Sequence, residues 1–308
     1  MSESIPLVDL RDWSDPARRA DFVRTLGEGL EQFGFVAVIG HGVDSDRLDA
    51  LYASARDLFA LPEPAKRRYE TPEDGRQRGY TSFGVEHAKD TLVPDLKEFW
   101  HVGRSLGADH PLHVSGDVPP NLWPAELPEF RARFSDYYAD IEAFAGRLLA
   151  AVALYLGHDE GYFARLTHDG NSVLRIIHYP DTPDAAPGAV RAAAHEDINL
   201  LTVLPVSTRP GLEVMTRDGR WLAVNPGPNV MVCDTGDMMA VLTNGRLPAT
   251  THRVVNPERQ DGGRLSMPFF LHPHPDALLS PGVPGISPPV RTREFFHARL
   301  RDIGVERR

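Results

Sequence analysis

The sequence predicts a mainly β protein with flanking α-helices, and three features indicate this class. Between residues 172 and 275, short apolar and β-branched segments alternate with turns rich in Gly, Pro, Asp and Asn, as strands do. Before this region, apolar residues recur at helical spacing over 45–61 and 129–156. At 308 residues the length suits one β domain with added helices. We therefore expect a single domain over 1–308, with an N-terminal helix and strand region over 1–120 and a β core over 172–275.

Short strands and helices alternate in the N-terminal part of the expected fold. In chain order we expect a strand over 5–10, a helix from Asp15 and Pro16 to about residue 32, a strand over 35–39, a helix over 45–61 and a strand over 97–102. Gly34 ends the first helix, and Asp44 with Ser45 caps the second. Residues 71–93 lose all periodicity, which predicts an irregular loop that either borders a binding site or is a solvated surface.

A long amphipathic helix and a series of short strands are expected after residue 128. The helix spans 129–156, and Gly157 ends it. The expected strands lie at 173–178, 198–205, 211–216, 221–224, 229–233, 250–254 and 264–271. A proline-rich extended segment over 281–289 then leads to a last helix over 292–303.

Three side chains of the β core form a candidate metal site. His195 and Asp197 are two residues apart, so a strand would project both from one face. His252 lies 57 residues further on, in another β-rich segment. Two histidines and one carboxylate with open coordination positions are typical of non-haem Fe(II) oxygenases. Zinc accepts the same ligands and would support hydrolysis instead.

A second motif, Arg264-Leu265-Ser266, follows His252 by twelve residues. Alternation along a strand puts Arg264 and Ser266 on one face, where a guanidinium fork and a hydroxyl can bind a single carboxylate. Zinc hydrolysis gives no reason for such a pair. The order of the three metal-ligand candidates and this motif therefore favours iron.

These motifs resemble the isopenicillin N synthase-like group of Fe(II)/2-oxoglutarate-dependent dioxygenases. The similarity extends over nearly the whole chain, and also includes the segments 5–10, 34–42 and 175–180. It implies a double-stranded β-helix, or jelly-roll, core that holds iron. It also implies that His195, Asp197 and His252 are the metal ligands.

The resemblance assigns the carboxylate pair as well. It implies that Arg264 and Ser266 bind 2-oxoglutarate, joined by Tyr179. Many plant members carry Asn-Tyr-Tyr-Pro where this chain has Ile177-His178-Tyr179-Pro180, so only Tyr179 of that motif carries over.

The implied activity uses Fe(II), 2-oxoglutarate and O₂. Oxidative decarboxylation of 2-oxoglutarate is coupled to hydroxylation, desaturation or ring closure of a small-molecule substrate. Two alternatives stay open: an Fe(II) oxidase resembling isopenicillin N synthase, which uses no 2-oxoglutarate, and a non-catalytic jelly-roll ligand sensor. Candidate substrate contacts are Arg76, Arg78, Phe83, Asn199 and Phe270.

Composition restricts the partners of the protein. A net charge of −10 argues against nucleic acid, which requires a basic face. No run of 18 apolar residues and no basic, apolar leader appear, so we expect a cytoplasmic protein with no membrane segment. The one cysteine, Cys233, is expected to be a small buried residue. Oligomeric state is left open.

Overall fold

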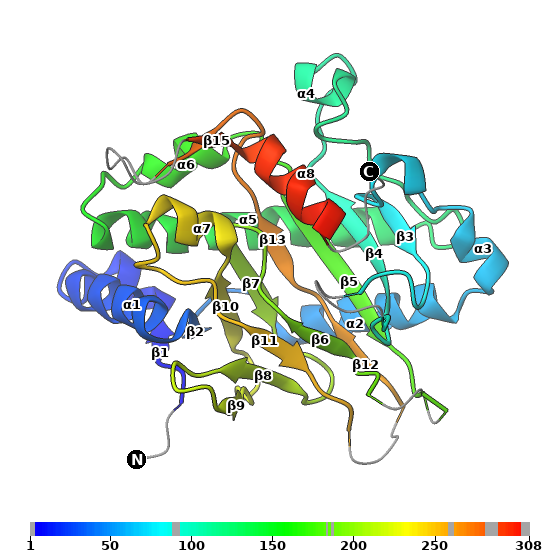
Figure 1. Ribbon diagram of the computed structural model, residues 1–308, viewed down its shortest axis with the longest axis horizontal. Coiled ribbons are helices and arrows are strands. Elements are labelled where there is room, and N and C mark those ends of the chain that lie inside the picture. Colours follow the sequence, from blue (N-terminus) through cyan, green and yellow to red (C-terminus); the bar gives the residue numbers. More distant parts are fainter. Residues whose placement is uncertain are drawn as a thin grey trace.

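The computed structural model describes residues 4–87, 93–182, 184–185, 188–257, 262–280 and 289–302. Two sheets enclose a cavity, and this arrangement confirms the mainly β class with a jelly-roll core (Figure 1). The large sheet runs in the order β1 (Leu7–Asp9), β2 (Phe35–Ile39), β10 (Met231–Thr235), β7 (Leu201–Pro205), β13 (Phe269–Leu271), β5 (Val173–Tyr179), β4 (Glu98–Gly103) and β3 (Gly79–Thr81), and β12 (Arg264–Ser266) also pairs with β5. The small sheet runs β6 (Ala192–His195), β11 (His252–Val254), β8 (Leu212–Met215) and β9 (Trp221–Ala223). A separate hairpin joins β14 (Leu278–Leu279) to β15 (Val290–Arg291).

The N-terminal strands belong to the large sheet. β1 pairs with β2 in parallel, and β2 pairs with β10 of the β core. On the other side, β4 pairs with β5 along its whole length. The first part of the chain therefore extends the sheet of the core, a relation that no local pattern indicated.

The helices lie mainly on the outside of the large sheet. They are α1 (Arg19–Phe33), α2 (Ser45–Ala60), α3 (Glu63–Arg67), α4 (Pro111–Val114), α5 (Phe130–Tyr155), α6 (Tyr162–Thr167), α7 (Asp237–Leu242) and α8 (Thr292–Asp302), with 3-10 turns at Leu10–Ser14 and Pro72–Asp74. Figure 1 shows α5 as the long green helix across the strands, and it contacts β4, β7 and β13. No helix in the described ranges is long and apolar enough to cross a bilayer.

Strict alternation along β5 separates the core from the cavity. Leu174 and Ile176 are fully buried in the same apolar cluster as the inward face of α5. Arg175, Ile177 and Tyr179 point the other way and line the cavity between the sheets. Burying an aliphatic side chain such as Ile176 contributes roughly 1.5–3 kcal/mol, which fixes the register and so keeps the polar face of β5 turned to the cavity.

Most expected elements are confirmed, and the differences have physical causes. Gly34 ends α1 in the left-handed region (φ 68), where glycine has no steric penalty. Asp44 caps α2 by accepting a hydrogen bond from the Asp46 amide (2.9 Å). The expectation of an irregular loop over 71–93 was wrong in part, because β3 forms there by pairing with β4. The proline-rich segment 281–289 falls almost entirely outside the described residues, as does Ile303.

Candidate metal centre and its cavity

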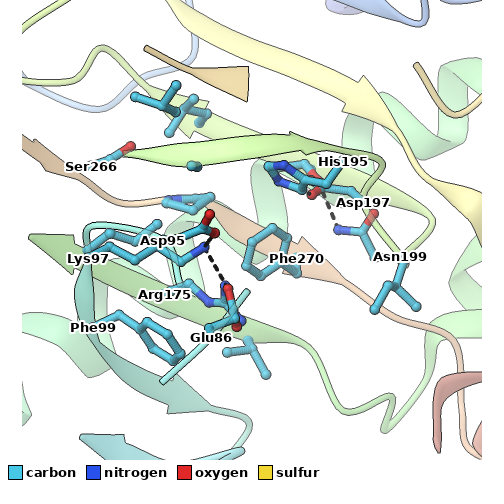
Figure 2. A pocket seen from close by; sticks show the side chains of 18 of the residues that line it. Glu86, Asp95, Lys97, Phe99, Arg175, His195, Asp197, Asn199, Ser266 and Phe270 are labelled. Atoms are coloured by element: carbon cyan, nitrogen blue, oxygen red, sulfur yellow. Dashed lines mark hydrogen bonds and ion pairs between the residues drawn. The ribbon is translucent and has the colours of Figure 1, made fainter. Parts of the chain in front are cut away.

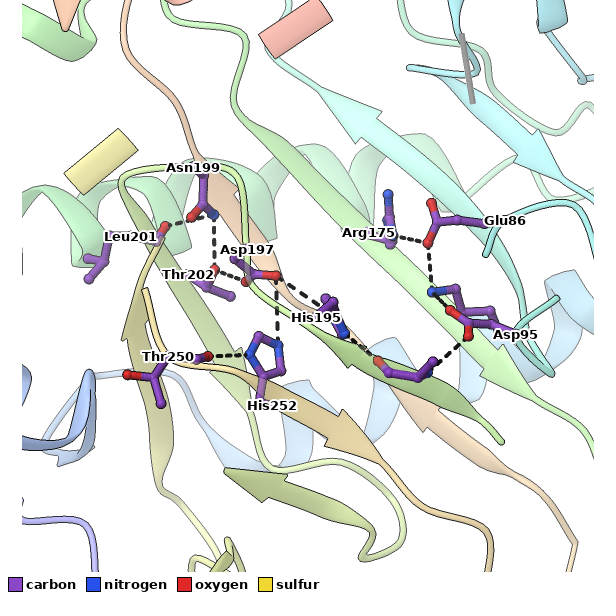
Figure 3. A network of polar contacts seen from close by, with 12 residues as sticks. Glu86, Asp95, Arg175, His195, Asp197, Asn199, Leu201, Thr202, Thr250 and His252 are labelled. Carbon is purple, nitrogen blue, oxygen red and sulfur yellow. Dashed lines mark hydrogen bonds and ion pairs between the residues drawn. The ribbon is translucent and has the colours of Figure 1, made fainter. Parts of the chain in front are cut away.

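Strand pairing brings the two candidate histidines together. β6 and β11 are antiparallel, and His195 is the direct partner of His252, with ring centroids 4.4 Å apart. The Oδ1 atom of Asp197 lies 3.8 Å from Nε2 of His195 and 3.7 Å from Nε2 of His252. One ligand atom from each of the three residues lies within 4.8 Å of the others, so a single ion can reach all three (Figure 3).

Both imidazole rings are oriented through their other nitrogen. Nδ1 of His195 lies 2.7 Å from the Ala193 carbonyl, and Nδ1 of His252 lies 3.1 Å from the Thr250 carbonyl. A carbonyl only accepts, so each Nδ1 carries the hydrogen and each Nε2 has a free lone pair. Desolvation in the cavity wall, followed by the neighbouring His252, lowers the pKa of His195, which favours the neutral form that binds metals.

Asp197 is held by Thr202, which the sequence analysis did not single out. The Thr202 hydroxyl donates to Oδ2 of Asp197 and accepts from Nδ2 of Asn199 (2.9 Å). Asp234, on β10 opposite Thr202, also lines the cavity, and burial and the charge of Asp197 raise its pKa. These contacts leave Oδ1 of Asp197 turned toward the histidines.

The expectation that one strand supplies two ligands was wrong. β6 ends at His195, and Asp197 lies in the turn that follows. The backbone carbonyl of Asp197 accepts a hydrogen bond from the Asp237 amide (2.7 Å), which fixes this turn against the start of α7. Gly236 allows the approach, because a Cβ there would lie 2.6 Å from the Asp197 carbonyl oxygen.

Arg264 and Ser266 line another part of the same cavity. Arg264 is a direct partner of Tyr179 across β12 and β5, and its guanidinium carbon lies 5.1 Å from the centre of the Tyr179 ring. Its Nε donates to the Arg209 carbonyl (3.0 Å) and its Nη2 to the Ser207 hydroxyl (2.6 Å). Ser207, which the sequence did not single out, thus orients the guanidinium.

The donor set fits an anionic ligand beside a divalent metal. Nη1 of Arg264 is buried and has no hydrogen-bond partner among the described residues. Burial of this side chain lowers its pKa, because desolvation disfavours the charged guanidinium. A carboxylate supplied by a ligand would satisfy it, and the metal triad lines the same cavity.

Three of the five candidate substrate contacts line the cavity, and two do not. Arg76, Asn199 and Phe270 line the cavity. Arg78 does not: it is 1% exposed and its guanidinium donates to Asn171 and to the Gln77 carbonyl. Phe83 is 44% exposed and does not line the cavity either. The sequence pattern could not give the side-chain direction in a segment without periodicity, and for these two residues the expectation is corrected.

The cavity is also lined by charged residues that the sequence analysis missed, among them Glu86, Asp95, Lys97 and Arg175 (Figure 2). Arg175 could have been noticed, since a cation stands alone in the apolar strand Val173–Tyr179. Glu86 offered no signal, because it lies in the loop before β4.

Comparisons with known proteins agree with this geometry. The family model for the N-terminal region of non-haem dioxygenases in morphine synthesis matches residues 5–126, and the 2OG-Fe(II) oxygenase superfamily model matches 170–273. A 2-oxoglutarate-Fe(II) type oxidoreductase of Emericella nidulans is 32% identical over 88% of this chain and 80% of its own length. The chain belongs to the 2-oxoglutarate–Fe(II) oxygenases.

Solved structures place the oxygenase among proteins that bind the co-substrate. A 2OG-Fe(II) oxygenase family protein from Caulobacter crescentus is 39% identical, with a TM-score of 0.87 over 98% of this chain and all of that one. A Neurospora crassa protein, solved in complex with α-ketoglutarate and thymine, is 26% identical with a TM-score of 0.83, over 96% of each chain. This oxygenase therefore depends on Fe(II), 2-oxoglutarate and O₂ and acts on a small molecule. The alternative of an oxidase without 2-oxoglutarate finds no support among these relatives.

Proposed function

We propose that this oxygenase holds Fe(II) through Nε2 of His195 and His252 and the carboxylate of Asp197, and hydroxylates a small molecule bound in the adjoining cavity. The proposal is supported by the convergence of the three ligand atoms and by the orientation of both rings. Bound iron and 2-oxoglutarate would supply the chemistry: the keto acid is oxidised to succinate and CO₂, with one oxygen atom of O₂ entering succinate and the other entering the substrate as hydroxyl.

Arg264 is assigned to the distal carboxylate of 2-oxoglutarate. Its Nη1 is the donor that has no partner among the described residues, and this single observation carries the assignment. The Tyr179 ring flanks the guanidinium, and the Ser266 hydroxyl lies 3.4 Å from that of Ser207, which holds Nη2. These residues orient the co-substrate, and the apolar cavity residues Leu204 and Leu212 limit water around it.

Substrate contacts are assigned to Asn199, Phe270 and Arg76, which all line the cavity. Asn199 is fixed by the Thr202 hydroxyl and has a buried Oδ1 without a partner among the described residues. The chain is proposed to act as one domain, since β1–β4 extend the sheet of the core. The cytoplasmic location and the exclusion of nucleic acid stay predictions, the latter supported by the net charge of −10.

An anaerobic titration tests the co-substrate site. Fe(II)-loaded protein is titrated with 2-oxoglutarate while the visible charge-transfer band of the chelated keto acid is followed. We expect Arg264→Ala to weaken binding at least about tenfold, because hydrogen bonds to charged groups contribute roughly 1.5–3 kcal/mol. Arg104→Ala is the matched control, since Arg104 pairs with Glu142 and does not line the cavity. Unchanged affinity in Arg264→Ala would overturn the assignment.

A further inference from the structure

A compact set of charged side chains forms one wall of the cavity. Nζ of Lys97 lies 2.6 Å from Oε1 of Glu86 and 2.8 Å from Oδ2 of Asp95. Nη1 of Arg175 donates to the same Oε1 of Glu86 (3.0 Å). In Figure 2 the Phe270 ring lies between this cluster and the side of the cavity that carries His195 and Asp197.

The wall carries no net charge. Burial opposes ionisation of Glu86, but the charges of Arg175 and Lys97 outweigh it and lower the pKa of this carboxyl. Burial likewise disfavours the charged form of Lys97, and Glu86 with Asp95 reverses this and raises its pKa. Two carboxylates therefore face two cations. A charged ligand would gain no net attraction here and would lose its hydration, so the wall suits a neutral one.

Arg175 is fixed so that one edge of its guanidinium stays available. Its Nε donates to Nε2 of His101 (2.7 Å), and since arginine cannot accept, Nδ1 of His101 carries the hydrogen and donates to the Arg76 carbonyl (3.0 Å). The guanidinium carbon lies 4.3 Å from the centre of the Phe99 ring and 5.2 Å from that of Phe270. Nη2 makes no hydrogen bond to any described residue, so it is a held donor.

Glu86 presents the complementary acceptor. Its Oε1 pairs with both Arg175 and Lys97, whereas Oε2 is buried and has no hydrogen-bond partner among the described residues. A buried carboxylate oxygen without a donor costs free energy until a ligand supplies one. Because Arg175 and Glu86 both line the cavity and are joined by a 3.0 Å hydrogen bond, the unused donor and the unused acceptor belong to neighbouring side chains of the wall.

We propose that the substrate is a neutral, flat molecule with an N–H next to a carbonyl, as in a lactam or cyclic imide. Its N–H donates to Glu86, its carbonyl accepts from Arg175, and its ring lies beside Phe270. This inference rests on the proposed function, since it concerns the substrate of the same iron site.

A chain of contacts ties this recognition pair to the metal ligands. Lys97 joins Glu86 to Asp95, whose Oδ1 accepts a hydrogen bond from the Ala193 amide (2.9 Å). The Ala193 carbonyl in turn accepts from Nδ1 of His195 (2.7 Å), as Figure 3 shows. The position of a substrate held by Glu86 is thereby fixed relative to the iron, which a regioselective hydroxylation requires.

Calorimetry on the anaerobic protein loaded with Fe(II) and 2-oxoglutarate tests the proposal. The probes are thymine, which has an N–H and carbonyl edge, and 1,3-dimethylthymine, which has the same ring without a donor. Benzoate and benzylamine are the charged probes of similar size. We expect thymine to bind at least about tenfold more tightly than the other three, as the loss of a hydrogen bond to a charged acceptor implies.

The variant Glu86→Gln should reduce this preference, because a neutral amide oxygen accepts a hydrogen bond more weakly than a carboxylate, so the affinities for thymine and dimethylthymine should come closer together. Glu142→Gln is the matched control, because Glu142 pairs with Arg104 and does not line the cavity. Thermal unfolding of both variants shows whether Glu86→Gln is folded, and the wild-type ranking of the four probes tests the proposal even if it is not.

Two outcomes would overturn the inference: dimethylthymine binding as tightly as thymine, or a charged probe binding best. If the 2-oxoglutarate band forms normally in either case, the proposed function stands and only the substrate class is wrong. If the band never forms but calorimetry still ranks thymine first, the recognition pair stands and the co-substrate assignment fails.

Discussion

Removal of the Thr202 hydroxyl is the sharpest test of how the metal site is held. Thr202 is 3% exposed and lies on the cavity face of β7. Its hydroxyl donates to Oδ2 of Asp197 and accepts from Nδ2 of Asn199. Thr202→Val keeps the branched shape and the strand preference but removes both hydrogen bonds. Asn199 keeps its second contact, to the Leu201 carbonyl (3.3 Å), whereas Oδ2 of Asp197 loses its donor.

The magnitude follows from the charge on the acceptor. A hydrogen bond to a charged group contributes roughly 1.5–3 kcal/mol. Partners of metal ligands change metal affinity by about 10–100-fold when they are removed. We therefore expect Thr202→Val to bind Fe(II) about 10–100-fold more weakly, with a smaller loss in 2-oxoglutarate affinity at saturating iron.

A competition titration with a chromogenic chelator measures the iron affinity of both proteins. Thr167→Val is the control, since the Thr167 hydroxyl donates to the Phe163 carbonyl within α6 and Thr167 does not line the cavity. Its iron affinity should match that of the unaltered protein. If Thr202→Val folds and binds iron as tightly as the unaltered protein, Thr202 does not orient Asp197, and the reasoning from this contact is wrong.

Two further predictions concern the frame around the site. Gly236→Ala should lower both the free energy of unfolding and the iron affinity, because its Cβ would lie 2.6 Å from the Asp197 carbonyl oxygen. Chemical denaturation measures the first quantity and the chelator titration the second. An unaltered iron affinity would show that the close approach of Gly236 to Asp197 does not position this metal ligand. Because the pKa of Glu86 is lowered from its usual value of 4.5, its carboxylate stabilises the fold fully above that pH and progressively less as the pH falls toward the folded-state pKa. The unfolding free energy of the metal-free protein should therefore decrease between about pH 5 and 3 more steeply than that of Glu86→Gln. Equal slopes would show that the buried ion pairs of Glu86 do not stabilise the fold.

Local patterns in the sequence were enough for the elements and for the kind of chemistry. Helical spacing and end signals predicted α2 and α5 nearly to the residue and the end of α1 at Gly34, because helices are stabilised by contacts three to four positions apart. The spacing of His195 and Asp197 and the Arg264–Ser266 motif predicted the metal and carboxylate chemistry, since these residue types are selected by what they bind. The assignment of Asp197 to the same strand as His195 failed because strand ends depend on partners elsewhere in the chain.

Only the tertiary structure decided which residues surround those motifs. Strand pairing aligns His101 with Arg175, and the loop before β4 brings Glu86 to the same wall. Thr202 reaches Asp197 because β7 follows the metal-ligand turn back into the large sheet. Such contacts join segments that are distant along the chain, and their register is set by burial of the opposite face against α5. No short-range periodicity contains that information, so the sequence predicted the candidate metal ligands but not the charged wall of the cavity.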